Sequence, residues 1–337
     1  MNTEILATHT SALFQQAVRR AADLLRAGEV VALPTETVYG LAANALDENA
    51  VAKIFQIKGR PSHNPIIVHI TGNEMVRDCV KNFSELAEKF SKSFWPGPLT
   101  LVLPRAGKIP DAVTAGGETV GVRWPSHPFM QAVIRECGFP LAAPSANLSN
   151  QISPTNAAHV HAQLGGKIPL IVDGGQSQVG IESTVLDLTV SPPRVLRPGM
   201  IHAESLAAVG GEIQNPESRI QNPESALRSP GLLAKHYSPK AKLVVLDWHD
   251  EAELRGQLAA RNFEPATSFV IAHTHIPAGE HFADVSVMPH DAEAFARALY
   301  GELHHCDAAG AQLIVVEAPP DSPEWSGIAD RLRRAAA

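Results

Sequence analysis

The chain has 337 residues, 45% of them hydrophobic and 19% charged, and these proportions exclude a wholly disordered protein. Its 28 basic and 35 acidic residues give a net charge of −7 at pH 7, which argues against a strongly basic protein that wraps nucleic acid. The apolar runs fall far short of the ~18 to 20 residues that a membrane-spanning helix needs, so we expect no membrane contact.

Charge is unevenly distributed along the chain. Residues 1–205 contain 17 basic and 17 acidic residues, whereas residues 241–337 contain 7 basic and 15 acidic residues. We therefore expect any anion-binding site before residue 240. The segment 1–10 lacks the basic and apolar regions of a signal peptide, which predicts a cytoplasmic protein. Three cysteines without a CxxC spacing are predicted to be small buried thiols.

Residues 1–207 are predicted to form an α/β domain. Apolar residues at three- and four-residue spacing predict helices at Ser11–Ala27, Glu48–Ile57, Ser84–Phe94, Pro128–Cys137 and Asn156–Leu164. Short apolar runs bounded by turn residues predict strands at Val30–Leu33, Ile66–Ile70, Leu99–Leu103, Thr119–Val122, Leu170–Val172, Thr184–Leu188 and Arg194–Leu196. Some strands follow each other too closely for a crossover helix, so the sheet is expected to be mixed.

Residues 208–240 are predicted to be a linker. The unit IQNPES is duplicated here, beginning at Ile213 and again at Ile220, and it has too little apolar content to build a core. The segment from Ser229 to Pro239 has apolar anchors, and we expect it to act as a lid. Residues 241–337 alternate strands and helices, which predicts a second, smaller α/β domain.

Two motifs of the first domain carry chemistry-bearing side chains. Thr35, Glu36 and Thr37 follow a predicted strand, where a ligand crevice is expected, although either threonine could simply cap a following helix. Lys58 and Arg60 end a predicted helix, where they could bind the last carbonyls or could clamp a phosphate group.

Further candidates stand at the ends of later strands. Arg123 ends one strand and could be a surface ion-pair residue or a ligand for a carboxylate. Ser145 and Asn147 could be turn formers beside Pro144 or could contact a ligand. Polar groups recur in the segments 182–187 and 196–199. Taken one at a time, none of these signals is specific.

Taken in order, the motifs PTETVYGL, KGRP, GVRWP, APSAN, ESTVLD and LRPG resemble the YrdC/Sua5 family of L-threonylcarbamoyladenylate synthases over residues 11–205. The SPG and HYSP motifs at 229–231 and 236–239 are similar to the linker of the long Sua5 form. The resemblance implies a YrdC-like twisted mixed sheet with flanking helices, followed by a smaller Rossmann-like C-terminal domain.

The implied activity is that of a nucleotidyltransferase, which forms threonylcarbamoyl-AMP and pyrophosphate from L-threonine, bicarbonate and ATP. The product would pass to a partner transferase that modifies adenosine 37 of tRNAs reading codons that begin with A. The resemblance places these residues around threonine: Thr35, Thr37, His69, Arg123, Ala143 and Ser183. It places these around ATP: Lys58, Arg60, Asn64, Thr119, Ser145, Asn147, Ser153, Arg197, Ser229 and Tyr237. Lys58, Arg60, Ser145 and Asn147 would be catalytic.

The resemblance also bears on the cofactor. Mg²⁺ is expected to arrive with ATP and to be held by phosphate oxygens and water, because the motifs contain no dedicated carboxylate cage. The neighbouring histidines at 273 and 275, and at 304 and 305, lack the ligand set of a zinc site.

Two alternatives remain open at this point. The first is a non-catalytic module that binds tRNA or double-stranded RNA, although the balanced charge of the first domain disfavours tight, salt-dependent binding. The second is a YciO-type relative with the same fold and a different reaction, against which the KGR and SAN motifs argue.

Overall fold

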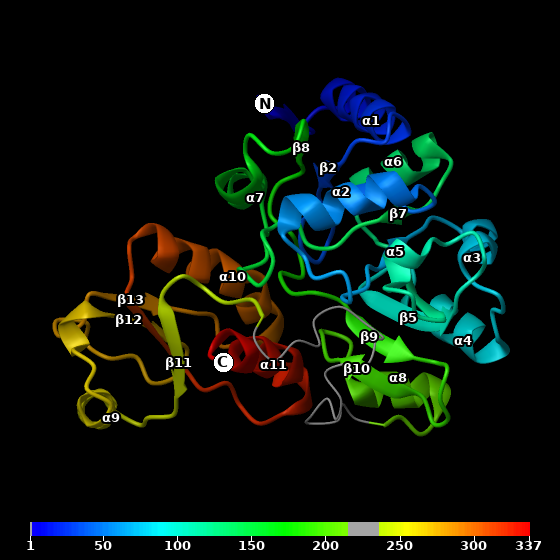
Figure 1. Ribbon diagram of the computed structural model, residues 1–337. Coiled ribbons are helices and arrows are strands. Elements are labelled where there is room, and N and C mark those ends of the chain that lie inside the picture. The colour runs from blue at the N-terminus through cyan, green and yellow to red at the C-terminus, as the bar shows by residue number, and fades with distance from the viewer. Residues whose placement is uncertain (1, 215–235) are drawn as a thin grey trace. The chain divides into compact units, whose positions relative to one another are not determined.

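The computed structural model describes residues 2–214 and 236–337, which form two units (Figure 1). The first unit contains residues 2–149 and 153–214, and the second contains Asn150–Ile152 and residues 236–337. Ser229 and nearly all of the duplicated segment lie outside the described residues, and so does most of the predicted lid. No helix of the described part is both long and apolar enough to cross a membrane.

The first unit is built on a ten-stranded sheet with the order β1-β8-β2-β3-β7-β4-β6-β5-β9-β10. Its strands are β1 Glu4–Ala7, β2 Val31–Leu33, β3 Gly40–Asn44, β4 Val68–His69, β5 Leu99–Pro104, β6 Thr119–Arg123, β7 Leu141–Ala142, β8 Leu170–Asp173, β9 Thr184–Asp187 and β10 Arg194–Arg197. The pairs β2–β3, β3–β7, β4–β7, β5–β6 and β9–β10 are antiparallel, while β1–β8, β2–β8, β4–β6 and β5–β9 are parallel. The prediction of a mixed sheet is confirmed.

Helices cover this sheet and define its two hydrophobic cores. They are α1 Ser11–Arg26, α2 Glu48–Lys58, α3 Asn73–Cys79, α4 Glu85–Phe94, α5 Asp111–Thr114, α6 Pro128–Cys137, α7 Ala157–Leu164 and α8 Ala203–Gly210. α1 and α6 lie side by side in Figure 1 and pack on Val31 and Leu33 of β2. The intervening Ala32 faces the second core, which includes α2 and α4. This alternation follows from strand geometry, in which successive side chains point to opposite faces.

Several short elements were not predicted from the sequence. β3 reads GLAAN and is buried on both faces, so it shows neither the alternation nor the β-branched residues that mark a strand. β7 has only two residues, and α5 only four. The strand predicted at Ile66–Ile70 is confined to Val68–His69, because Ile66 N–H donates to the carbonyl of Val113 outside the sheet.

The second unit has a four-stranded sheet with the order β11-β14-β12-β13, in which every pair is parallel. Its elements are β11 Lys242–Leu246, α9 Glu251–Ala260, β12 Ser268–Ala272, β13 Asp284–Val287, α10 Ala292–Ala308, β14 Leu313–Glu317 and α11 Ser326–Ala335. Leu254 and Leu258 of α9 pack on Val270 and Val315 of the sheet. The expected Rossmann-like α/β architecture is confirmed.

Candidate functional site

The turn that follows β2 orders two threonine hydroxyls. Thr35 Oγ1 donates to the carbonyl of Val38 at 2.6 Å and accepts the backbone N–H groups of Thr37 and Val38. The Thr37 hydroxyl lies 2.9 Å from Thr35 Oγ1. The two hydroxyls and the backbone of this turn therefore hold one another in place. The chain then enters β3, so the alternative in which these threonines cap a helix is wrong.

Arg123 ends β6 beneath this turn and is 3% exposed. Its guanidinium donates to Thr37 Oγ1 at 2.9 Å and to the carbonyl of Gly97 at 3.2 Å, and it forms an ion pair with Glu36 at 2.6 Å. Burial alone would raise the pKa of Glu36, but the adjacent guanidinium outweighs it and holds that pKa below its usual value. Arg123 is therefore a buried, charged fork and not a surface residue.

His69 stands directly beside Arg123, because His69 of β4 and Arg123 of β6 are partners in the parallel register. The imidazole is 3% exposed. Burial first, and then the positive charge of Arg123, lowers the pKa of His69 to about 3. At neutral pH the ring is uncharged and can offer one donor and one acceptor to a ligand.

Lys58 is the last residue of α2, and its ammonium group is buried in a cage of oxygens. Nζ donates to the carbonyl of Ser145 at 2.5 Å, to the carbonyl of Asn147 at 2.5 Å and to Asn147 Oδ1 at 3.1 Å. Burial and the nearby Arg60 lower the pKa of Lys58. The last turn of α2 is capped by the backbone N–H groups of Gly59 and Arg60, so the helix-capping alternative for Lys58 is wrong. The lysine instead fixes the loop that carries Ser145 and Asn147.

Arg60 organises the segment that leads into β4. Its Nε donates to the carbonyl of Asn64 at 3.0 Å, and its Nη2 donates to Asn64 Oδ1 at 2.7 Å and to the carbonyl of Pro65 at 2.6 Å. Asn64 is fully buried, yet its Nδ2 group has no hydrogen-bond partner within residues 2–214 and 236–337. A buried amide donor left in this way is suited to an acceptor on a ligand.

Ser183 and Arg197 are joined directly. Arg197 Nη2 donates to Ser183 Oγ at 3.1 Å, and Arg197 Nε donates to the Ser183 carbonyl at 3.1 Å. Ser183 Oγ also lies 2.8 Å from Thr100 Oγ1. Beside this group, Ser153 Oγ donates to Glu182 Oε1 at 2.6 Å. Sequence reasoning missed Thr100, which stands inside the apolar strand β5 and gives no motif signal.

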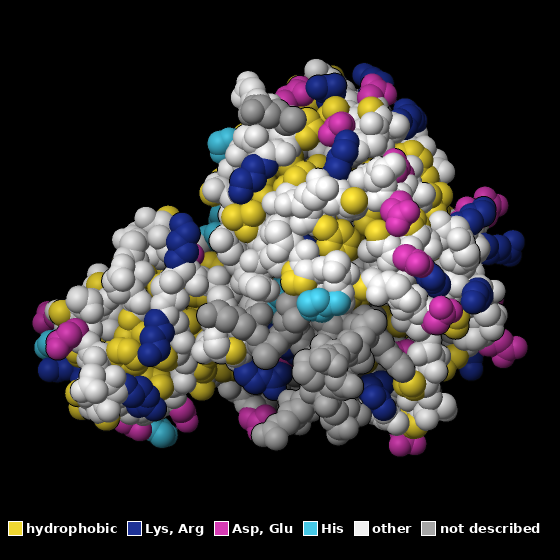
Figure 2. Space-filling model, in the orientation of Figure 1, with side chains coloured by type: hydrophobic (Ala, Val, Ile, Leu, Met, Phe, Trp, Pro, Cys, Tyr) yellow, Lys and Arg dark blue, Asp and Glu magenta, His cyan; other side chains and the backbone are white. Residues whose placement is uncertain are grey.

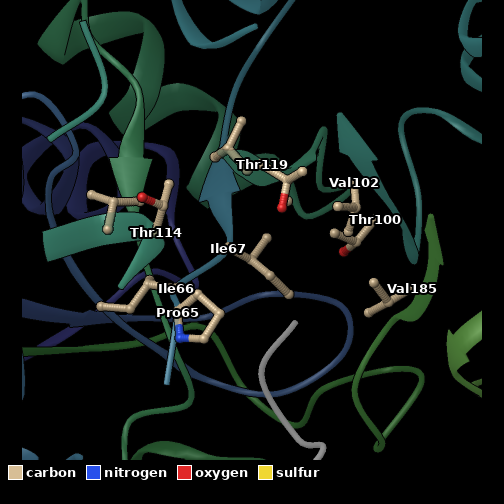
Figure 3. Close-up of a pocket in the computed structure, with 11 residues that line it drawn as sticks. Pro65, Ile66, Ile67, Thr100, Val102, Thr114, Thr119 and Val185 are labelled. Atoms are coloured by element: carbon tan, nitrogen blue, oxygen red, sulfur yellow. The ribbon is translucent and has the colours of Figure 1, made fainter. Parts of the chain in front are cut away.

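A pocket opens beside these residues on the strand face shown in Figure 3. Its walls come from β5, β6, β9, α5 and the segment before β4, and its cavity volume of about 10 Å³ has room for about one water molecule. The lining residues are Pro65, Ile66, Ile67, Thr100, Val102, Val113, Thr114, Thr119, Val120, Gly121 and Val185. The predicted ATP residue Thr119 lies here, and Ile67 accepts the backbone N–H of Ala143 through its carbonyl.

Two residues predicted to contact ATP are not in the described part of the first unit. Tyr237 belongs to the second unit, where its ring stacks edge-on against His236 at 3.9 Å and lies 5.4 Å from the Arg331 guanidinium. Ser229 lies outside the described residues. Within the described chain, no three His, Cys, Asp or Glu side chains gather as metal ligands would.

Comparison with known proteins gives consistent matches to both parts of the chain. Residues 23–199 match the family Sua5_yciO_yrdC, described as "Telomere recombination", and residues 201–337 match "Threonylcarbamoyl-AMP synthase, C-terminal domain". The chain is 41% identical over 321 residues to the threonylcarbamoyl-AMP synthase of Pyrococcus abyssi, covering 94% of this chain and 93% of the relative. It is 43% identical over 324 residues to that of Bacillus subtilis, covering 95% and 92%. The solved structure of Pyrococcus abyssi Sua5 complexed with L-threonine matches with a TM-score of 0.91 at 38% identity, covering 100% of this chain and 98% of that one.

Proposed function

Because the chain belongs to the Sua5/YrdC family, we propose that it condenses L-threonine, bicarbonate and ATP into threonylcarbamoyl-AMP with release of pyrophosphate. The observation that carries this proposal is a single cluster of buried polar residues in the first unit. The cluster contains His69 and Arg123, which suit an amino acid, together with Arg60 and Arg197, which suit a polyphosphate.

The amino-acid end of the proposed site is built from Thr37, His69, Arg123 and Ser183. Arg123 donates one N–H to Gly97 and one to Thr37, while its Nη2 group is paired by charge with Glu36 and has no hydrogen-bond partner among the described residues. The Nη2 group is therefore suited to the threonine carboxylate. The Thr37 hydroxyl accepts from Arg123 and is hydrogen-bonded to Thr35, and these two contacts orient it. The L-threonine complex of the Pyrococcus abyssi relative supports this substrate.

The nucleotide end combines polar donors with cations. Thr119 is half-buried beside the small apolar pocket and would offer its hydroxyl to the nucleotide. Asn64 Nδ2 offers a buried donor, while Arg60 and Arg197 would neutralise phosphate charge. Lys58 would act mainly by holding the Ser145 to Asn147 loop in place, since its three N–H groups already meet three oxygens.

The chemistry requires little more than positioning. The threonine amine and bicarbonate give a carbamate, which is an anionic nucleophile, so attack on the α-phosphate needs no serine or cysteine nucleophile. Arg60 and Arg197 would offset the charge that grows on the departing pyrophosphate. Glu36 is committed to Arg123 and Glu182 to Ser153, so we propose that Mg²⁺ is held by the nucleotide and water and shields phosphate charge there.

The proposal extends to the fate of the product. Threonylcarbamoyl-AMP is a mixed anhydride, and a transferase partner would pass its threonylcarbamoyl group to adenosine 37 of tRNAs that read codons beginning with A. A cytoplasmic location is part of this proposal, because its acceptor is tRNA.

The test is mass spectrometry of a reaction that contains the full chain, ATP, Mg²⁺, L-threonine and ¹³C-bicarbonate. We expect a threonylcarbamoyl-AMP adduct that carries the label, together with pyrophosphate release that requires threonine and bicarbonate at the same time. Pyrophosphate release that is independent of either substrate would refute the reaction and would favour a YciO-type relative with different chemistry.

A non-catalytic RNA-binding role has little support. On the face shown in Figure 2, Lys and Arg side chains are interspersed with Asp and Glu instead of forming one basic surface. The cations of the cluster are also buried, with Arg60 8% exposed and Arg123 and Arg197 3% exposed, whereas binding to a phosphate backbone needs accessible lysines and arginines.

A further inference from the structure

Thr100 is a buried hydroxyl with a single side-chain contact in the candidate site. It stands in the interior of β5 and is 0% exposed. Among residues 2–214 and 236–337, the only hydrogen-bond partner of its Oγ1 is Ser183 Oγ at 2.8 Å. A strand that packs between two neighbours needs no hydroxyl at this position for its own ladder, and valine would fill the same volume. Any effect of the Thr100 hydroxyl on a bound ligand therefore passes through Ser183.

The direction of this hydrogen bond follows from counting protons and lone pairs. Either hydroxyl of this pair can be the donor, and among the described residues one of the two buried protons has no acceptor in either direction. A carboxylate beside Ser183 satisfies both protons only when Thr100 donates to Ser183 Oγ and Ser183 donates to the carboxylate. Arg197 Nη2 donates to the same oxygen at 3.1 Å. A serine oxygen has two lone pairs and one proton. Both lone pairs of Ser183 are then occupied, and its own proton is left for the substrate.

We propose that Thr100 is a positioning residue that makes Ser183 an obligate hydrogen-bond donor to the carboxylate of bound L-threonine. This inference rests on the proposed function, because it takes threonine as the ligand.

The experiment measures L-threonine binding to the full chain by calorimetry, for the wild type, Thr100→Val, Thr100→Ser, Ser183→Ala and the double variant Thr100→Val with Ser183→Ala. We expect Thr100→Val to raise the Kd for L-threonine roughly three- to tenfold, the effect of one lost hydrogen bond. Thr100→Ser keeps the hydroxyl and should stay near the wild-type value. In the Ser183→Ala background, Thr100→Val should not change the Kd for L-threonine further, because the hydroxyl through which Thr100 acts on the substrate is absent.

The matched control is Thr184→Val on the adjoining strand β9. Thr184 is equally buried, but its hydroxyl donates to the carbonyl of Ile201 and accepts the backbone N–H of Ile201, so neither contact involves a predicted threonine ligand. The same loss of a buried hydroxyl should therefore leave the Kd for L-threonine unchanged. Three results would overturn the proposal. They are a comparable rise in the Kd for L-threonine in Thr184→Val, a further rise when Thr100→Val is added to Ser183→Ala, and a Kd for Thr100→Ser as high as that for Thr100→Val.

The donor role is tested with L-threoninamide, which replaces the carboxylate by a neutral acceptor. Hydrogen bonds to a charged group are about twice as strong, so Ser183→Ala should cost more affinity for L-threonine than for L-threoninamide. Equal losses would contradict the donor assignment. Failure of L-threonine to bind the wild type would overturn this inference, whereas binding without incorporation of labelled bicarbonate would overturn only the proposed reaction.

Discussion

Arg123 holds three partners at once, and the planar fork of its guanidinium makes this possible. Arg123→Lys keeps the positive charge but loses the fork, so the ion pair with Glu36 can survive while the contacts to Gly97 and Thr37 cannot all be kept. We predict that the KM for L-threonine rises about tenfold or more, and that the KM for ATP changes much less. The measurement is steady-state kinetics with each substrate varied in turn. An equal rise in the KM for L-threonine and the KM for ATP would contradict the assignment of Arg123 to threonine.

His69 makes stability depend on pH. Burial and the charge of Arg123 lower its folded-state pKa to about 3, while an unfolded histidine titrates near 6.5. Between these two pH values the unfolded chain binds a proton that the folded chain does not, so the free energy of unfolding falls as the pH decreases, by up to about 1.4 kcal/mol per pH unit. Above pH 6.5 this contribution is constant.

The matching variant is His69→Gln, which has no titrating ring. Between pH 7 and pH 4, we predict that the wild type loses more free energy of unfolding than the variant, as measured by urea titration at each pH. If the wild type and His69→Gln lose the same free energy of unfolding between pH 7 and pH 4, His69 is not held uncharged in the folded protein.

At the scale of an element, the end of α2 places both cations of the KGR motif. Gly59 has φ 59° and ψ 37°, a left-handed conformation that turns the chain between Lys58 and Arg60. A Cβ there would meet no atom within 4 Å, so alanine would suffer only backbone strain, about 1 kcal/mol. We predict that Gly59→Ala lowers the free energy of unfolding by that amount in urea and raises the KM for ATP.

Gly138→Ala is the control for this variant. Gly138 ends α6 with φ 77° and also has open space around its would-be Cβ, but it adjoins no predicted ATP residue. The same loss of stability should therefore leave the KM for ATP unchanged. If Gly59→Ala and Gly138→Ala raise the KM for ATP by the same factor, the effect does not come from the positions of Lys58 and Arg60, and the prediction for Gly59 is wrong.

The long periodic elements could be predicted from the sequence, because they bury a face with a regular period. α1 and α6 match the predicted ranges within one residue. β3 could not be predicted, since its alanines and glycine are buried by tertiary packing that leaves no pattern. The motifs located Arg123 and Lys58, but the partners of these residues depend on chain segments 86 to 89 positions away, and local spacing carries no such information.

At the scale of the whole molecule, charge argues against tight binding of RNA. The net charge is −7, and the basic residues of the first 205 positions are matched by an equal number of acidic ones. We predict no tRNA complex at micromolar protein and about 150 mM salt in a mobility-shift assay, because few phosphate contacts can form. Tight binding that weakens steeply with salt would restore the RNA-binding alternative.

The three residues Asn150–Ile152 are grouped with the second unit, although the chain on both sides of them is grouped with the first. Gln151 forms a β-bridge with Ser238, and Ser238 N–H donates to the carbonyl of Asn150. This short excursion lies between Asn147 and Ser153, two residues proposed to contact ATP. Loss of residues 236–337 would therefore also remove the bridge partner of Gln151, a residue that lies in the chain between Asn147 and Ser153. A chain shortened in this way would need a different anchor for the segment Asn150–Ile152.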